Sequence, residues 1–452
     1  MRQYVELLAA RDWSRSIIVG SPCVIGGWAD VGSVVSTESE SVVAPMRPGA
    51  PHGKLGAKAD WEDLMDRVVI AGGGVAALEA ALALQALAPK QVEVELLAPE
   101  PHFSYRALTV AEPFGVAGVD RFDLQAIAGE VGAQLTSGAL ASVDAKRHAI
   151  QTKAGAELGY DALVIACGAR PRRDTSGALV FGSGEGGSPL RDLLAEIEDG
   201  SLRSIAFVVP GGVSWSLPLY ELALLTAAHL EDQGIEDVEL TLVTPEQAPL
   251  EVFGSKVSEA TRELLSERGI VLEVGKNVAP GGEGTRRLIP EGALEVDRIV
   301  TLPRLVGPSI GGVKQTPDGF VPTDAHGRVA DLPDVYAAGD ITAFPVKQGG
   351  IAAQQADAVA EAIAARAGAK ITPTPFEPVL RGLLLTGGVA EYFRAELGSG
   401  HGDTSRAATD ALWWPPAKVV GRYLSPFLAA HTELALAAPG SAVHERSELS
   451  GI

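Results

Sequence analysis

From residue 67 onward, short apolar runs rich in β-branched residues alternate with longer stretches of alanine and leucine. Apolar runs of about four to eight residues predict buried strands, and the longer stretches between them predict helices. Strands that alternate with helices in this way are typical of a parallel sheet. The clearest predicted strands are 67–71, 92–97, 204–209 and 238–243, and the clearest predicted helices are 75–87 and 351–365.

Two of these strand–helix–strand units are similar in sequence. The second strand of each reads VELLAPE at 94–100 and LTLVTPE at 240–246. Each of these strands follows another strand, a glycine-containing turn and a helical stretch. A βαβ unit that occurs twice in one chain predicts a duplicated nucleotide-binding fold.

Composition and charge exclude several classes of protein. The chain has 452 residues, enough for two or three domains, and 46% of them are hydrophobic. Its net charge of −20 would repel a polyanion, so we expect no nucleic-acid partner. The two cysteines, Cys23 and Cys167, exclude a disulfide framework and favour a reducing, cytoplasmic compartment. Histidines lack metal-ligand spacing, and no apolar run is long enough to span a membrane.

The two ends of the chain differ from the rest. Small and polar residues dominate 31–58, and three prolines stand close together there. Such a composition does not bury enough apolar surface to order itself. We predict that 1–64 is a dispensable or disordered extension, with a regulatory arm as the alternative, and that 437–452 is a tail.

The first glycine turn carries the candidate phosphate-binding residues. GGGVAA at 72–77 fits the pattern G-x-G-x-x-A between a strand and a helix. Gly72 permits the tight turn, and Gly74 lets a pyrophosphate approach the backbone. The small residues Ala76 and Ala77 let the helix pack closely on the strand, and the helix N-terminus supplies N–H groups and partial positive charge. The alternative is a glycine-rich turn that only packs.

The expected ribose-binding acid is displaced in this sequence. An acid normally ends the second strand of such a unit, but that position holds Ala98. Glu100, two residues later, could reach the ribose. It could equally be a solvated loop charge.

Two later segments complete the pattern. YDALVIACGARP at 160–171 resembles the strand-to-turn "ATG" element of pyridine-nucleotide-linked flavoproteins, with Cys167 where threonine is usual. VYAAGD at 335–340 resembles the "AAGD" element of the same proteins. These two segments and the first glycine turn make three elements, and their order and spacing resemble those of the glutathione-reductase-type flavoprotein superfamily. The segments 101–108 and 242–246 are similar to those of sulfide:quinone oxidoreductases and type II NADH dehydrogenases.

The resemblance implies an α/β fold with two Rossmann-like, three-layer dinucleotide-binding domains and a C-terminal cap. It assigns 66–175 and 325–370 to an FAD domain, 176–324 to a second, degenerate NAD(P)-type domain, and 371–436 to the cap. It also implies that Asp340 binds a ribityl hydroxyl or phosphate and that Arg106 contacts the pyrophosphate. The helix after Asp340 would point its N-terminus at the flavin pyrimidine edge. The remaining residues that it places at FAD are Cys167, Gly168, Gly339, Lys347 and Gln348.

Several of these residues have a second interpretation. Cys167 ends an apolar run, and we expect it to be a small buried residue rather than a redox thiol. Lys347 could instead be a solvent-facing loop lysine. In the cap, Trp413 and Trp414 could meet a quinone or a lipid surface, but packing in the core or a dimer face is the favoured interpretation.

The second unit departs from the nucleotide-binding pattern. Its turn, PGGVSWSLPLYE at 210–221, lacks the third glycine. Trp215 and Pro218 fall where the phosphate-facing helix should begin, so NAD(P)H binding is left open. The chain also lacks the paired redox cysteines of sulfide:quinone oxidoreductases and of dithiol reductases, so we expect neither mechanism.

These observations predict an FAD-dependent oxidoreductase. Electrons would pass from a reduced donor, NAD(P)H among the candidates, through the flavin to a quinone or another small acceptor. No side chain is assigned as a catalytic acid or base. The alternative function is a flavin- or nucleotide-binding redox-regulatory protein without efficient turnover. Peripheral membrane contact and a homodimer are left open.

Overall fold

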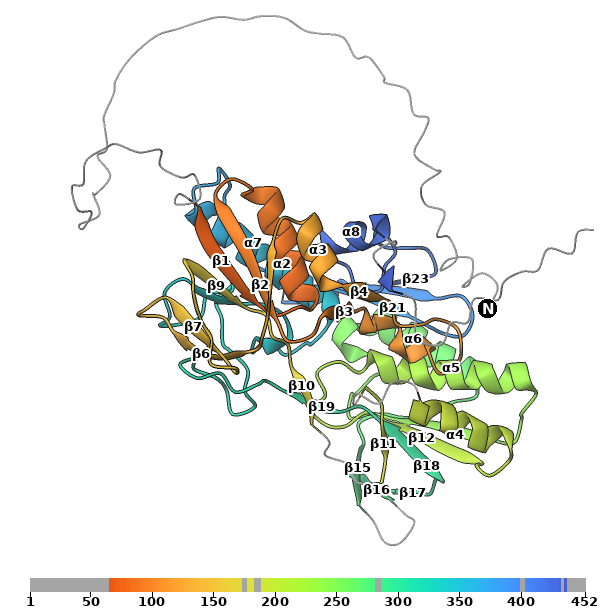
Figure 1. The fold of residues 1–452 in the computed structure, drawn as a ribbon. Helices are drawn as coiled ribbons and strands as arrows, with labels where there is room; N and C mark the ends of the chain where they lie inside the picture. Colours follow the sequence, from red (N-terminus) through yellow and green to blue (C-terminus); the bar gives the residue numbers. More distant parts are fainter. Residues whose placement is uncertain are drawn as a thin grey trace, which may run out of the picture.

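The computed structural model describes residues 65–172, 177–182, 188–280, 286–398, 403–431 and 435–436. The predicted extension 1–64 and the predicted tail 437–452 lie outside these residues, so the structure tests neither prediction. Two parallel sheets form the centres of two units, and a smaller antiparallel sheet from the C-terminal part of the chain lies beside both (Figure 1).

The first sheet has five strands in the order β20-β9-β1-β2-β5, and every neighbouring pair is parallel. Four of the strands come from the first part of the chain, and the fifth, β20, arrives from beyond the second sheet. The strands are β1 (Asp66–Ala71), β2 (Val92–Ala98), β5 (Gln134–Ser137), β9 (Ala162–Ile165) and β20 (Val335–Ala337).

Both faces of this sheet are buried, so it is the middle of three layers. Val68 and Ile70 of β1 pack into the cluster under the helices, whereas Val69 and Ala71 pack on the opposite face. The helices are α2 (Val75–Leu87), α3 (Leu124–Glu130) and α7 (Gly349–Arg366). The third layer is the antiparallel sheet of β6 (Leu140–Asp144), β7 (Ala149–Thr152) and β8 (Glu157–Gly159).

The second sheet repeats this arrangement. Its order is β11-β18-β12-β13-β14, again with parallel neighbours, so β12 and β13 take the places of β1 and β2. The predicted duplication is therefore confirmed in three dimensions. The elements are β11 (Leu179–Val180), α4 (Ser188–Glu198), β12 (Ser204–Val208), α5 (Leu217–Gln233), β13 (Glu239–Val243), α6 (Ser255–Glu267), β14 (Val271–Glu273) and β18 (Arg298–Thr301).

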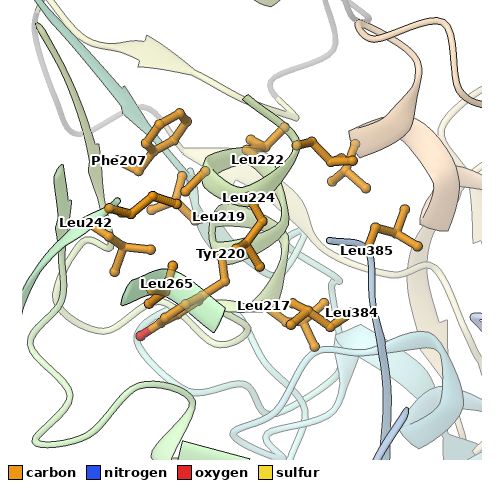
Figure 2. Packing of buried hydrophobic residues seen from close by; sticks show 14 of the residues in the cluster. Phe207, Leu217, Leu219, Tyr220, Leu222, Leu224, Leu242, Leu265, Leu384 and Leu385 are labelled. Carbon is orange, nitrogen blue, oxygen red and sulfur yellow. The ribbon is translucent and has the colours of Figure 1, made fainter. Parts of the chain in front are cut away.

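The core of the second unit forms around α5. Tyr220 is fully buried in a cluster with leucines of the sheet, of α5 and of the C-terminal segment (Figure 2). Because Leu384 and Leu385 belong to this cluster, the cap and the second unit share one hydrophobic core. Burial of shared apolar surface fixes the cap on this unit.

The cap is an antiparallel sheet of β21 (Val379–Leu384), β22 (Glu391–Glu396) and β23 (Arg406–Ala408), followed by α8 (Leu424–Ala430). Trp413 is half-buried: its ring centroid lies 5.1 Å from that of Tyr392, and its Nε1 donates to the Ala417 carbonyl. This is the packing role that the sequence favours for it. Trp414, by contrast, is 75% exposed.

The remaining elements connect these parts. The antiparallel pair β10 (Arg170–Arg172) and β19 (Arg304–Val306) carries the chain between the two units. None of the helices in the described ranges is long and apolar enough to cross a membrane. The other elements are β3 (His102–Ser104), η3 (Arg106–Ala111), β4 (Arg121–Asp123), η4 (Glu251–Phe253), β15 (Asn277–Pro280), β16 (Arg286–Ile289), β17 (Ala293–Leu294), η5 (Gly339–Ile341) and β24 (Ala435–Leu436).

Candidate functional site

The strand order brings the three sequence motifs to one edge of the first sheet. β20, β9 and β1 are neighbours and parallel, so their carboxyl ends meet there. Ala338 N donates to Ile165 O over 3.1 Å, and Ala166 N donates to Ala71 O over 2.9 Å, which extends the pairing into the turns. In open α/β sheets, ligands bind at this edge, where the strand order reverses on either side of the first strand.

The first glycine turn is tight on one side and open on the other. A β-carbon on Gly72 would lie 2.2 Å from Ala166 O, so only glycine fits there. Gly74 is the N-cap of α2, and a β-carbon on it would meet nothing within 4 Å. Ala77 is fully buried between helix and sheet. The turn therefore offers open space directly in front of a helix N-terminus, as an approaching pyrophosphate requires.

The third motif is fixed by a residue that the sequence analysis missed. Gly339 N donates to Gln355 Oε1 over 2.8 Å, and the Thr342 hydroxyl donates to the same oxygen over 3.3 Å. Gln355 is buried on α7 in an alanine-rich stretch. A polar residue amid so many alanines is the signal that could have identified it, because a buried amide needs hydrogen-bond partners.

Asp340 presents a carboxylate that no donor of the described chain satisfies by hydrogen bonding. The residue is half-buried, and burial raises the pKa of its carboxyl, while the nearby charge of Lys347 opposes the rise. A carboxylate in this state is suited to accept hydrogen bonds from hydroxyl groups of a ligand.

Lys347 is buried, which neither sequence interpretation anticipated. Its ammonium donates to the carbonyls of Thr342 and Phe344 and lies 3.9 Å from the centroid of the Phe320 ring. Burial lowers the pKa of Lys347 to about 8, and the charge of Asp340 opposes that shift. These contacts hold the loop between Asp340 and α7; a direct contact with flavin stays a prediction.

Gln348 caps the helix that follows. Its side-chain oxygen accepts from Ile351 N over 2.9 Å, and its amide donates to the Arg381 carbonyl over 3.0 Å. Gly349, the first residue of α7, faces Val419 of the cap: a β-carbon on Gly349 would lie 2.9 Å from a Val419 methyl carbon. The structure thus gives Gln348 a helix-capping and cap-binding role; a hydrogen bond to a cofactor stays a prediction.

The expectation that Cys167 is buried was wrong. Its side chain is exposed just beyond the end of β9, although burial of the thiol raises its pKa to about 11. A thiol with a raised pKa is a poor nucleophile at neutral pH, because little of it is present as thiolate. Gly168 beside it has φ of 67°, and a β-carbon there would meet nothing within 4 Å. The chain departs from the sheet at this point to leave room at its edge.

The predicted ribose and pyrophosphate contacts outside the glycine turns, Glu100 and Arg106, are solvent-exposed. Glu100 lies in the turn after β2, and no hydrogen bond joins its carboxylate to the described chain. Arg106 begins η3, and its carbonyl accepts from the Thr109 hydroxyl. No side-chain hydrogen bond to the described chain fixes either residue, so their assignment to a ligand stays a prediction.

The residues present at the edge of the first sheet fit FAD. An open helix N-terminus suits a pyrophosphate, an unsatisfied carboxylate suits ribityl hydroxyls, and glycine turns without side chains leave space for a long planar ligand. Bound FAD supplies two-electron chemistry that no side chain of the described site provides.

The chain matches known proteins over this region. A curated relative, the ferredoxin–NAD(+) reductase component of the biphenyl dioxygenase system of Paraburkholderia xenovorans, is 26% identical over 308 residues, which are 64% of this chain and 70% of that protein. The sulfide-quinone reductase of Aquifex aeolicus is 28% identical over 217 residues, 44% of this chain and 47% of that protein.

Solved structures share the fold. The sulfide:quinone oxidoreductase of Aquifex aeolicus aligns with a TM-score of 0.67 at 20% identity, over 73% of this chain and 84% of that one. The putidaredoxin reductase–putidaredoxin complex aligns with a TM-score of 0.53 at 18% identity, over 73% and 81%. The family model for pyridine nucleotide-disulphide oxidoreductases matches residues 66–365. The chain therefore belongs to the pyridine nucleotide-disulphide oxidoreductase family and is an FAD-dependent oxidoreductase.

Proposed function

We propose that the protein passes electrons from a small reduced donor through FAD to a quinone or another small acceptor. The observation that carries this proposal is the convergence of three turns at one sheet edge, where no residue of the described ranges donates a hydrogen bond to the Asp340 carboxylate. The similarity to a sulfide-quinone reductase supports a quinone as the acceptor.

In this proposal the chain's own residues bind and orient the cofactor. The N-terminus of α2 at Gly74 holds the pyrophosphate, and Asp340 accepts from the ribityl chain. Glu100 and Arg106 add contacts at the ribose and pyrophosphate. The N-terminus of α7 would lie at the flavin pyrimidine edge, where its partial positive charge would stabilise negative charge on the cofactor.

A relay through a cysteine pair is not part of the proposal. The sequence has only Cys23 and Cys167, and the Cys167 thiol has a raised pKa. Electrons would therefore enter and leave at the flavin itself. We also propose a cytoplasmic location. The proposed domains are an FAD domain of 66–175 with 325–370, a second domain of 176–324 and a cap of 371–436. Peripheral membrane contact would involve the exposed Trp414.

The test uses the FAD-loaded protein without any biological donor. The flavin is photoreduced anaerobically, a short-chain quinone is added, and recovery of the visible flavin band is followed by stopped flow. We expect reoxidation much faster than that of free reduced FAD at equal concentration. Reoxidation no faster than that of free FAD would reject the proposal and favour the redox-regulatory alternative.

A further inference from the structure

The second unit of the duplicated fold has the position of a dinucleotide site but different contents. Its glycine turn, 210–216, lies between β12 and α5, and β13 runs parallel beside β12. The residues after β13 therefore lie next to this turn at the carboxyl edge of the sheet. We propose that Glu246, which follows β13, closes this site from within, and that the second unit binds no nicotinamide dinucleotide.

The Glu246 carboxylate is held across the start of α5 by three hydroxyl groups. Ser216, the N-cap of α5, donates to Oε1 over 3.2 Å. Tyr220 and Thr244 donate to Oε2 over 2.7 Å and 2.8 Å. Both oxygens are therefore bound to the protein, and the N-cap hydroxyl serves Glu246 in place of the backbone of the helix.

This arrangement places a carboxylate where the dinucleotide needs a free helix N-terminus. A helix N-terminus attracts one anion through its N–H groups and dipole, and a carboxylate serves as well as a phosphate. In nucleotide-binding units, an acid that follows the second strand also accepts hydrogen bonds from the ribose. Here both Glu246 carboxylate oxygens accept from hydroxyl groups of the protein. The carboxylate is therefore not free to bind a ribose, and it occupies the space that a phosphate would need.

Burial makes this position of Glu246 difficult to vacate. Tyr220 is fully buried in the core of the second unit, and Figure 2 shows its ring among the labelled leucines of the cluster. Burial raises the pKa of the Glu246 carboxyl, the hydroxyls of Tyr220, Thr244 and Ser216 lower it, and the charge of Glu251 raises it. The charge of the Glu246 carboxylate would repel a phosphate that entered the turn.

Other side chains lie beside the turn, although a β-carbon on Gly212 would meet nothing within 4 Å. Trp215 packs toward the core, with its ring centroid 5.7 Å from that of Phe253. A β-carbon on Gly211 would lie 2.9 Å from the Asn277 side-chain oxygen, so the space beside this glycine is already taken. Ser214 O accepts from Lys347 N over 3.4 Å, which ties the turn to the loop before α7.

The first unit provides the internal comparison. There α2 begins directly at Gly74, the space before it is open, and the strand end holds the small residue Ala98. Glu100 is exposed and makes no hydrogen bond to the first glycine turn. The same fold in one chain thus carries one open and one closed phosphate turn. In this proposal the second unit has the strand order of a dinucleotide-binding fold but binds no dinucleotide, because its phosphate turn is closed.

A consequence for electron transfer follows, and it rests on the proposed function. A donor that reduces the flavin must reach it without docking as a dinucleotide on the second unit. The donor class is then a small reductant or a carrier that meets the flavin directly. The binding claim itself does not depend on which donor is used.

The first experiment measures binding on the full-length, FAD-loaded protein, so that the first unit is occupied. ADP-ribose and NAD⁺ are titrated by calorimetry, and NADH and NADPH are added anaerobically while the flavin band is observed. We expect dissociation constants weaker than about 1 mM and no bleaching. Saturable binding of ADP-ribose tighter than about 100 µM, or rapid bleaching, would overturn the inference.

Two substitutions identify the closing group. Glu246→Ala opens the turn, and we expect ADP-ribose binding to improve at least about tenfold over the native protein. Glu246→Gln keeps the size of the side chain and should remain closed, and Glu251→Ala removes a nearby charge without opening the turn. Thermal melting verifies that each variant is folded. If folded Glu246→Ala binds no better than Glu246→Gln, Glu246 is not the closing group.

The proposed electron transfer through FAD and the proposed closure of the second unit can be rejected independently of each other. Reoxidation of photoreduced flavin by quinone needs no nicotinamide, so its failure rejects the proposed function alone. Nicotinamide binding with normal reoxidation rejects the closed second unit alone.

Discussion

Gly339 lies directly against Ala76: a β-carbon on the glycine would approach the alanine methyl carbon to 2.9 Å. Gly339 has φ of 81°, a conformation that favours glycine, so the turn cannot easily move away to accept a side chain. This contact joins the turn after β20 to the first helix, although the two are far apart in sequence. The open space at Gly74 and the carboxylate of Asp340 are therefore fixed relative to each other before any ligand binds.

Gly74→Val tests the pyrophosphate end of the site. A β-carbon at this position meets nothing within 4 Å, and the valine methyl groups would occupy the space in front of α2, so we expect loss of FAD with little change in melting temperature. The ratio of flavin to protein absorbance of the purified variant is the measurement. Gly129→Val, at an exposed glycine of α3 with equally open space, is the matched control and should retain FAD. A Gly74→Val protein with full FAD would show that the first motif is misassigned.

Asp340→Ala tests the ribityl end of the proposed FAD site. Its carboxylate has no hydrogen-bond donor in the described chain, so its removal should cost ligand contacts rather than folding stability. Loss of one charge-assisted hydrogen bond predicts roughly 10- to 100-fold weaker FAD binding. Reconstitution of the apoprotein with FAD, followed by flavin fluorescence, gives the dissociation constant. Unchanged affinity in Asp340→Ala would place the ribityl contact elsewhere.

Asp357→Asn tests a carboxyl pair under the cap. Glu79 of α2 accepts from the backbone N–H groups of Tyr423 and Leu424, and it lies against Asp357 of α7. Burial and the charge of Glu79 raise the pKa of Asp357 to about 8. Because the folded chain binds this proton more tightly than the unfolded chain, stability falls as pH rises from the ordinary value of 3.8 toward about 8.

Asparagine mimics the protonated acid, so Asp357→Asn should equal the native protein in stability near pH 4 and become more stable than it by up to about 1.4 kcal/mol for each pH unit between pH 4 and pH 8. Thermal unfolding of both proteins across this range is the measurement, and the difference between them cancels the other titrating groups. A difference that does not grow with pH would mean that the pair does not share a proton.

Lys418→Met tests the attachment of the cap to the second unit. Lys418 forms an ion pair with Glu221 of α5, which is fully buried and also accepts from Leu385 N over 2.9 Å. Removal of the lysine leaves a buried carboxylate without its cation, which should cost about 3–5 kcal/mol. The double variant Lys418→Met with Glu221→Gln removes both charges and keeps an acceptor for Leu385, so it should recover most of that loss. Denaturant unfolding compares the two, and equal destabilisation would contradict the ion-pair explanation.

Much of the fold could be predicted from the sequence because its signals are local. The helix 75–87 agrees with α2 residue for residue, and the strand 92–97 agrees with β2 to within one residue. The similarity of 94–100 to 240–246 reveals the duplication, and the two sheets have corresponding strand orders. A glycine after an apolar strand marks a tight turn through the steric limits of its own backbone, so no distant partner is needed to recognise it.

The details of the sites depended on contacts that no local pattern contains. Cys167 ends an apolar run and yet is exposed, because the chain leaves the sheet at Gly168. Lys347 is buried because it folds back on carbonyls of its own loop and because the Phe320 ring, 27 residues earlier in the chain, lies beside its ammonium. The sequence by itself determined the elements, their duplication and the type of turn at each strand end. Only the tertiary structure decided which turn stays open and which is closed by Glu246, since that depends on hydroxyl groups that the fold brings to one carboxylate.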